Sequence, residues 1–241
     1  MFPTLQIGSF SIPVAQFSLL LAFWFGISLA EKLAPRHNVP ADKLYNLVFT
    51  GLITGLVGAR LGVVFQYPQA FIQSPLSLIS LNTSLFDTFS GIAAAMVGML
   101  VYGQRARLTL RESLDALTPI LAVLMVGIAF AHIASGQAFG METSLPWGID
   151  LLGAKRHPSQ FYELATATII LWWVLQHFKP NQQPARLFLE FVTLSAAARL
   201  LLDAFRGDSA TLSDGFRIAQ ITALGVMATS LALLDIIHRK S

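Results

Sequence analysis

Three ionisable residues, Arg199, Asp203 and Arg206, lie in one otherwise apolar stretch of this sequence. Their spacings of four and three residues place them on one face of a helix. An aspartate between two arginines stays ionised and holds both guanidinium groups in position. Two positioned guanidinium groups form a clamp that matches the oxygens of a phosphate. The spacing therefore predicts an anion site, and the alternative is an internal salt bridge that only fixes helix packing.

Two further ionisable residues lie in other apolar stretches of the chain, Arg60 and His132. An ionisable residue inside a membrane-spanning segment is costly, so it is a functional candidate by default. Arg60 is a second candidate ligand for the anion, and snorkelling of its side chain to the membrane surface is the alternative. His132 is the candidate general base because histidine titrates near neutral pH, and a packed, hydrogen-bonded histidine is the alternative.

A dense run of polar residues, Arg-His-Pro-Ser-Gln-Phe-Tyr-Glu, occupies positions 156–163, directly before another apolar stretch. Its proline suits the first turn of a helix. A helix start with an interfacial tyrosine explains part of this run, but it does not require so many kinds of polar side chain together. The candidate binding residues in this run are His157, Ser159, Gln160 and Glu163.

The composition is that of a membrane protein. Of the 241 residues, 54% are hydrophobic and only 12% are charged, whereas soluble domains carry about 25% charged residues. Together with a mean hydropathy of +0.63, this excludes a soluble enzyme, a disordered tail and a coiled coil. We expect one membrane-embedded domain over residues 1–241. The chain contains no cysteine, so any reacting thiol must belong to a substrate, and we expect neither a metal nor a cofactor.

Seven stretches are long and apolar enough to span a bilayer, which requires about 20 residues each. They are Ile12–Ala30, Leu44–Phe65, Leu85–Gly103, Leu114–Ile133, Phe161–Phe178, Leu187–Phe205 and Phe216–Ile237. The sequence therefore predicts an all-α polytopic membrane protein with seven transmembrane helices. Glycines recur at four-residue spacing in the second stretch, which predicts close helix packing there. No internal repeat is visible, which disfavours a transporter.

The positive charges alternate between the connections. Ten of the 16 lysines and arginines fall on one side of a seven-span arrangement, four on the other, and Arg60 and Arg199 lie within spans. The positive-inside rule then predicts an outer N-terminus and a cytoplasmic C-terminus. Because the segment before the first span contains no lysine or arginine, we expect that span to be a retained helix and no cleaved signal peptide. Membrane topology explains the basic balance, so no nucleic-acid partner is expected.

With this orientation, Arg60, His132, the run at 156–163 and the Arg199–Arg206 face all map to the outer side of the membrane. Independent snorkelling residues would occur at both ends of the helices. Their convergence predicts one site near the outer leaflet for an anionic lipid head group.

The run at 156–163 resembles the RHPSQLYE signature of the prolipoprotein diacylglyceryl transferases. Other elements follow in the same order over roughly residues 7–237. Gly58–Gly62 is similar to the family's GGRIG element, and Gly136–Gly140, which contains Gln137, is similar to its NGELWG segment. Arg199, Asp203 and Arg206 match a family Arg, Glu and Arg, with aspartate in place of glutamate.

This resemblance implies a multi-pass protein of the bacterial plasma membrane that acts in lipoprotein biosynthesis. The implied reaction moves a diacylglyceryl group from phosphatidylglycerol to a lipobox cysteine thiol of a precursor protein and releases glycerol phosphate. The arginines and Asp203, the polar residues of the 156–163 run and Gln137 would bind the phospholipid. The absence of cysteine fits an acceptor thiol that the precursor supplies.

Several central family positions are replaced in this chain. Ser90 stands where the family has its histidine base, Ala129 replaces an arginine, His132 replaces an asparagine, and Ser195 replaces a tyrosine. Because a serine hydroxyl is too weak a base to take a thiol proton unaided, His132 is the candidate replacement. The alternative function is that of a non-catalytic, phospholipid-binding relative that serves as a scaffold or subunit of a membrane complex.

Overall fold

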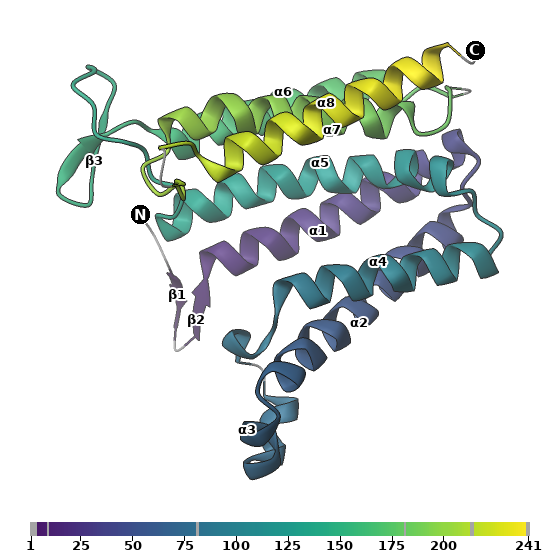
Figure 1. Cartoon of the computed structure of the whole chain (residues 1–241), viewed down its shortest axis with the longest axis horizontal. Coiled ribbons are helices and arrows are strands. Elements are labelled where there is room, and N and C mark those ends of the chain that lie inside the picture. Colours follow the sequence, from purple (N-terminus) through teal and green to yellow (C-terminus); the bar gives the residue numbers. More distant parts are fainter. Residues whose placement is uncertain (1–3, 9, 81, 181, 213–214, 240–241) are drawn as a thin grey trace. The chain divides into compact units, whose positions relative to one another are not determined.

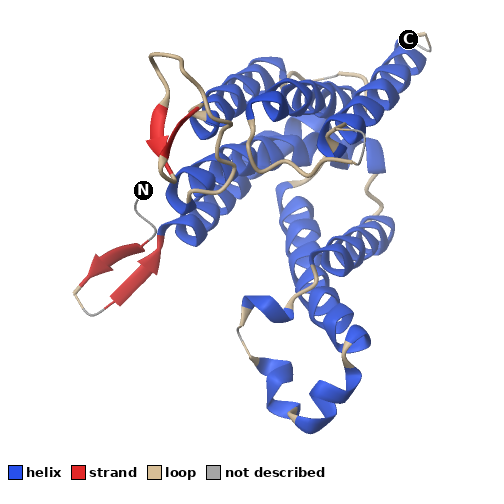
Figure 2. Ribbon diagram, turned by 60° about the vertical axis from the view of Figure 1, so that its left-hand side comes forward, coloured by secondary structure: helices blue, strands red, loops and turns tan. Residues whose placement is uncertain are grey.

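The computed structural model describes residues 4–8, 10–80, 82–180, 182–212 and 215–239. It is mostly helical and contains two compact units (Figures 1 and 2). The first unit combines Met1–His37 with Leu114–Ser241, and the second is Asn38–Ser113. The predicted single membrane domain stays a prediction.

Within the described residues, seven helices of 17 or more residues occupy the seven predicted stretches. The first unit holds α1 (Val14–Leu33), most of α5 (Leu110–Ser135), α6 (Ser159–His177), α7 (Arg186–Leu202) and α8 (Ile218–His238), and the second holds α2 (Ala41–Gln66) and α4 (Thr88–Arg105). Four segments are long and apolar enough to cross a membrane, namely Val14–His37, Ala41–Gln66, Leu110–Ser135 and Ile218–His238. Crossing by all seven helices stays a prediction.

The structure adds short elements that the all-helical prediction omits. They are β1 (Thr4–Ile7), β2 (Phe10–Pro13), η1 (Ala34–His37), α3 (Pro68–Gln73), η2 (Pro75–Ile79), η3 (Thr83–Leu85), β3 (Ile149–Leu151), β4 (Ala154–Arg156) and η4 (Asp203–Phe205). The strands form two antiparallel hairpins, β1–β2 and β3–β4 (Figure 2). Leu152 and Gly153 both have positive φ, 54° and 77°, the geometry that favours a two-residue hairpin loop.

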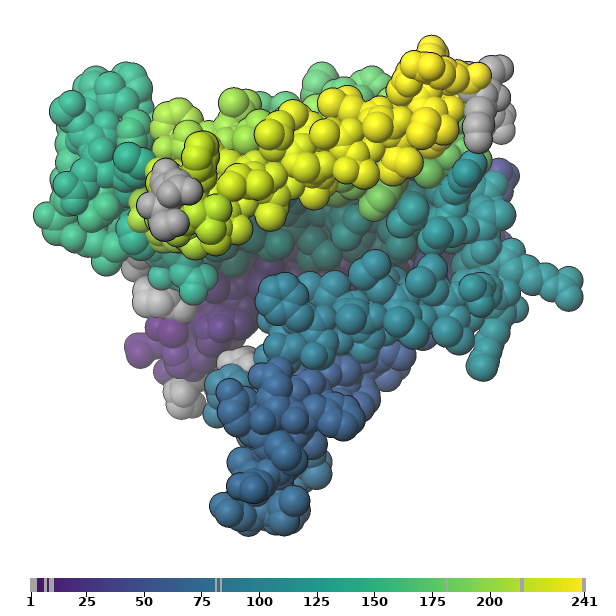
Figure 3. Space-filling view, in the orientation of Figure 1, coloured from purple at the N-terminus to yellow at the C-terminus, as the bar shows by residue number. Residues whose placement is uncertain are grey.

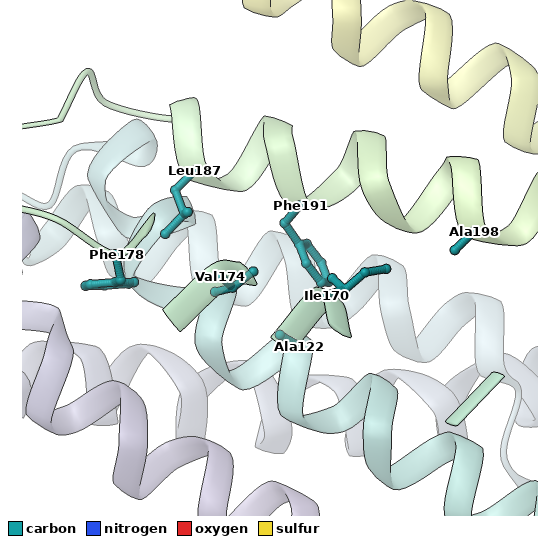
Figure 4. Close-up of a cluster of buried hydrophobic side chains, with 7 residues drawn as sticks. All are labelled: Ala122, Ile170, Val174, Phe178, Leu187, Phe191 and Ala198. Atoms are coloured by element: carbon teal, nitrogen blue, oxygen red, sulfur yellow. The ribbon is translucent and has the colours of Figure 1, made fainter. Parts of the chain in front are cut away.

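The core of the first unit lies where α6 and α7 pack on α5 (Figure 4). Its cluster of buried side chains consists of Ala122, Ile170, Val174, Phe178, Leu187, Phe191 and Ala198. Van der Waals packing of this kind is what holds helices together when the surroundings are as apolar as the side chains. The cluster therefore fixes α6 and α7, which carry the candidate residues Ser159, Gln160, Glu163 and Arg199.

A buried carboxylate on α5 caps the first turn of α7. The backbone N–H groups of Ala185 and Phe188 donate to Asp115 over 2.7 and 2.8 Å. Ala185 precedes the helix with a φ of 74° and has no side-chain oxygen of its own for the cap. A carboxylate at this end also interacts favourably with the helix dipole. Asp115 thereby sets where α7 begins.

Helix α8 presents an apolar surface along most of its length, and it lies on the outside of the first unit (Figure 3). Its exposed large side chains are Ile218, Ile221, Leu224, Val226, Leu231, Leu233 and Ile236. Soluble proteins rarely expose apolar patches of this extent. The surface therefore suits a hydrocarbon environment.

In the second unit, α2 and α4 approach closely through small residues, as the glycine spacing predicts. A Cβ atom on Gly58 would overlap that of Ala94, and one on Gly55 would lie 3.1 Å from the Cβ of Ala95. Glycine at these positions removes the side chain that would separate the two backbones.

Replacing Gly58 by alanine should destabilise the protein, because the new methyl group meets another helix at van der Waals overlap. Overpacking of this kind costs about 1–3 kcal/mol, so the midpoint of thermal unfolding in detergent should fall by several degrees. Gly103→Ala is the matched control, since the nearest atom, Cδ1 of Leu47, lies 4.0 Å from its added Cβ. Equal midpoints for the two variants would contradict this packing.

Candidate functional site

A cavity of about 150 Å³ lies in the first unit between α5, α6, α7 and the loops that follow α5 and α7. Five polar or charged side chains line it: Ser159, Glu163, Ser195, Arg199 and Arg206. The remaining lining residues are Met125, Ala138, Ala198 and Leu202. Four of the predicted site residues thus meet around one small polar space.

An apolar groove of about 640 Å³ adjoins this cavity between α5, α7 and α8. The two spaces share Met125, Ser195 and Arg199. The other groove residues are Leu121, Leu124, Ile128, Phe191, Val192, Ala196, Ala219, Thr222, Ala223 and Val226. A cavity with polar lining residues next to an apolar groove suits an amphiphilic ligand, with its polar head in the cavity and its apolar tail in the groove.

Arg199 is the charged residue at the junction of cavity and groove. Its side chain is 44% exposed, and its Nη2 atom lies 3.7 Å from Oδ1 of Asp203. This ion pair is too long for a hydrogen bond. The guanidinium group therefore keeps donors for a ligand while Asp203 holds it in place.

Asp203 is fully buried at the end of α7. Its Oδ1 atom accepts a hydrogen bond of 2.6 Å from the Ser209 hydroxyl, and Nη1 of Arg217 lies 3.9 Å from its Oδ2 atom. Arg217 also donates to the backbone oxygens of Asp203 and Arg206. Asp203 thus joins the end of α7 to the loop before α8.

The prediction that Arg206 shares a helix face with Arg199 and Asp203 is wrong. Helix α7 ends at Leu202, the next three residues form η4, and the backbone of Arg206 is extended. A different carboxylate holds this arginine, because Asp208 accepts hydrogen bonds of 2.9 and 3.0 Å from its Nε and Nη2 atoms. Arg206 still reaches the cavity, but from a loop.

Asp208 also accepts a hydrogen bond of 3.1 Å from the backbone N–H of Ala138. Partial burial by itself raises the pKa of the Asp208 carboxyl, but the hydrogen bonds and charge of Arg206, with the Ala138 amide, hold that pKa below its ordinary value. Asp208 therefore ties the loop after α7 to the loop after α5, and each loop contributes one residue to the cavity lining.

Two residues of the 156–163 run donate hydrogen bonds to backbone carbonyls of the loop after α5. The Ser159 hydroxyl donates to the Ala138 carbonyl over 2.6 Å, and Nε2 of Gln160 donates to the Gln137 carbonyl over 3.1 Å. Gln160 is fully buried, and among the described residues its Oε1 atom has no hydrogen-bond partner. Gln137 contributes its backbone oxygen to this contact, while its side chain is exposed.

The other polar residues of the run serve different neighbours. Arg156 donates to Glu142 and to the carbonyls of Leu151 and Gly140, and so braces the β3–β4 hairpin. The ring of His157 packs edge-on against Phe205, with 5.3 Å between ring centroids. Of the four residues predicted in this run, Ser159 and Glu163 line the cavity, while His157 and Gln160 are not among its lining residues.

His132 and Glu163 form a close pair beside the cavity. The Nδ1 atom of His132 on α5 lies 2.7 Å from Oε2 of Glu163 on α6. Both side chains are largely buried, with 21% and 19% exposed. Glu163 is the member of the pair that lines the cavity. The pair thus places the His132 imidazole in contact with Glu163, which lines the same cavity as Arg199.

Arg60 lies in the second unit. It is nearly buried and donates to the backbone oxygens of Leu85 and Ser80, and its guanidinium carbon lies 4.4 Å from the centroid of the Phe86 ring. These contacts hold the segment before α4. The prediction that Arg60 meets Arg199 in one site stays a prediction.

Ser90 also lies in the second unit, at the start of α4. Its backbone N–H donates to Asp87 over 2.7 Å, and its hydroxyl packs against the position of Gly62 on α2. Within the described residues, no cluster of three or more histidine, aspartate and glutamate side chains is arranged to hold a metal ion.

Two functional residues escaped the sequence-based prediction, Asp208 and Arg217. Asp208 lies only two residues after Arg206, and this proximity was the available signal. From the sequence alone, Arg217 is only a positive charge on the predicted outer side. Its hydrogen-bond partners lie 11 and 14 residues earlier in the chain, and no local sequence pattern predicts such contacts.

Replacing Asp208 by asparagine should loosen Arg206 and the two loops. At pH 7 the midpoint of thermal unfolding should fall by roughly 3–6 °C, as expected for the loss of about 1.5 kcal/mol. The folded-state pKa of Asp208 lies below the unfolded one, so its contribution is present above the unfolded pKa and is lost as the pH falls. The difference from wild type should therefore shrink between about pH 5 and pH 3. Asp150→Asn on the exposed side of β3 is the control, and a pH-independent difference would count against the ion pair.

Comparison with known proteins gives a family. The model of the prolipoprotein diacylglyceryl transferase family matches residues 3–236. Similar proteins, each named phosphatidylglycerol–prolipoprotein diacylglyceryl transferase, occur in Coxiella burnetii (26% identity, 70% of this chain and 67% of the relative), Aliivibrio salmonicida (28%, 74% and 65%) and Photobacterium profundum (28%, 76% and 73%). The matches span about two thirds of the length of these relatives. The chain belongs to the prolipoprotein diacylglyceryl transferase family of bacterial membrane proteins.

Proposed function

We propose that this protein binds phosphatidylglycerol and transfers its diacylglyceryl group to the thiol of a lipobox cysteine in a precursor protein. The names of its relatives contain both substrates, phosphatidylglycerol and prolipoprotein. The thiol belongs to the precursor because the chain itself has no cysteine.

The observation that carries this proposal is the position of Arg199. It is a half-exposed arginine that lines both the polar cavity and the apolar groove. A phospholipid has its anionic phosphate between a polar head and two acyl chains, so a cation at such a junction is where its phosphate would bind. The glycerol head would then occupy the cavity, and an acyl chain would lie along the groove.

Arg206, in the loop that follows α7, supports the same function. Asp208 accepts one hydrogen bond each from its Nε and Nη2 atoms, so three of the five guanidinium N–H groups are not used by this ion pair. In the transfer reaction, negative charge develops on the phosphate that leaves the glyceryl carbon, and fixed donors stabilise that charge. Arg199 would make the main contact, and Arg206 would provide a prealigned second one.

We also infer that all seven long helices cross the plasma membrane, with the N-terminus outside and the C-terminus in the cytoplasm. Seven long helices lie on the seven predicted stretches, and the positive charges alternate between their connections. In this orientation the cavity faces the outer side, where a secreted precursor is available. Both compact units would belong to one membrane-embedded domain over residues 1–241, and Arg60 remains a candidate ligand for the phosphate.

A second candidate function is phospholipid binding without transfer, as a scaffold or subunit of a membrane complex. It is favoured by two positions at which the family pattern has a histidine and an arginine. Here these are Ser90, packed against α2, and Ala129, which is fully buried. Neither residue offers a base or a cation to a substrate.

Replacing Arg199 by glutamine should weaken phosphatidylglycerol binding by roughly 10- to 100-fold, because a charge-assisted contact contributes about 1.5–3 kcal/mol. The measurement is binding of the lipid to purified protein in detergent, followed by transfer to a fluorescent lipobox peptide. Arg186→Gln is the matched control on the same helix, since Arg186 pairs with Glu190 and lies at the other end of α7.

Equal binding of phosphatidylglycerol by wild type and Arg199→Gln would overturn the assigned site. Binding by wild type without any transfer to the peptide would overturn the transferase function and favour the second candidate.

A further inference from the structure

The His132–Glu163 pair resembles an orienting carboxylate and its imidazole base in geometry. An ionised glutamate only accepts hydrogen bonds, so the proton of the 2.7 Å contact belongs to Nδ1 of His132. The carboxylate thereby fixes the tautomer, and Nε2 becomes the unprotonated nitrogen that can accept a proton. The same division of roles between a carboxylate and an imidazole activates nucleophiles in many hydrolases.

The surroundings of the pair suit proton transfer at this cavity. Glu163 lines the cavity, and the other charged side chains that line it are Arg199 and Arg206. Both are cations, and each also has a carboxylate partner of its own, Asp203 and Asp208 respectively. Glu163 remains the carboxylate of the cavity wall that is paired with an imidazole.

We propose that His132 accepts the proton of the acceptor thiol and that Glu163 is its positioning residue. This inference rests on the proposed transfer function and names the group that activates its nucleophile. A thiol is a weak nucleophile until it loses its proton, so a base near the phosphate-binding arginine is what the reaction needs.

The transfer breaks two bonds and forms two. The S–H bond of the precursor cysteine breaks, and its proton passes to Nε2 of His132. The sulfur electron pair forms a bond to the terminal glyceryl carbon, while the bond from that carbon to the phosphate oxygen breaks. Its electron pair leaves on glycerol phosphate, next to Arg199, and the imidazolium then releases its proton to water.

The first test is His132→Asn, which places a side-chain amide donor near Glu163 and removes the imidazole base. Because general base catalysis contributes roughly 10²- to 10⁴-fold, kcat for transfer to a lipobox peptide should fall by that factor. Phosphatidylglycerol binding should stay at the wild-type level, which also reports that the variant is folded. The pH profile of kcat should differ between wild type and the variant, because a general base contributes only in its unprotonated form.

The second test, Glu163→Gln, addresses positioning by a readout other than activity. The glutamine amide can donate to Nδ1 and so favour the wrong tautomer. The nitrogen chemical shifts of the His132 ring should therefore report a protonated Nδ1 in wild type and a mixture of tautomers in the variant. We expect kcat to fall by roughly 10- to 100-fold. The matched controls, Glu142→Gln on the hairpin side and His177→Asn at the other end of α6, should retain wild-type kcat.

The outcomes separate this inference from the function on which it rests. If wild type transfers lipid and His132→Asn keeps the wild-type kcat and pH profile, the pair is not the base and the proposed function stands. An unchanged tautomer in Glu163→Gln would overturn the positioning role. If wild type binds phosphatidylglycerol but transfers nothing, both the transferase function and the role of the pair are overturned.

Discussion

The first unit depends on how one fully buried carboxylate is satisfied. Asp203 lies where α7 ends, and burying an ionised group is tolerated only when partners replace water. The Ser209 hydroxyl donates to Oδ1, and Arg199 and Arg217 lie at ion-pair distances of 3.7 and 3.9 Å, while Oδ2 accepts no hydrogen bond within the described residues. The loop must therefore fold back over the end of α7, and this return brings Arg206 and Asp208 to the cavity.

The same constraint separates the arginines into two kinds. Arg206 and Arg217 each make short contacts to protein oxygens, so their positions are fixed before any ligand arrives. Arg199 has only a long ion pair to Asp203 and stays half exposed at the groove. A site that combines prealigned donors with one available cation can bind an anion without reorganising, which is the condition for stabilising charge that develops during a reaction.

Hydropathy was sufficient to predict the helices, because a long apolar stretch in lipid has to satisfy its backbone internally. It misplaced the end of α7 by three residues, since Ala204 and Phe205 continue the apolar pattern although the backbone has already changed to η4. That change follows from contacts of Asp203 with Ser209 and Arg217, which no local pattern encodes.

The β3–β4 hairpin was missed for a similar reason, as its strands are only three residues long and alternate too briefly to give a period. Glu163 was found from its place in a polar run, but its pairing with His132 across 31 residues required the structure.

The crowding of charges on one predicted side of the membrane has a second cause besides a ligand. Arg60 binds the carbonyls of Ser80 and Leu85, Arg156 those of Gly140 and Leu151, and Arg217 those of Asp203 and Arg206. In each case a guanidinium group satisfies backbone oxygens of a connection between two long helices, because such oxygens need partners when they are buried. Long connections lie on that side, so arginines gather there whether or not a ligand binds. Two arginines on that side donate to no backbone oxygen among the described residues, and of these Arg206 is held by short hydrogen bonds to Asp208. Arg199 has only its 3.7 Å ion pair there, and the case for an anionic ligand therefore rests on it.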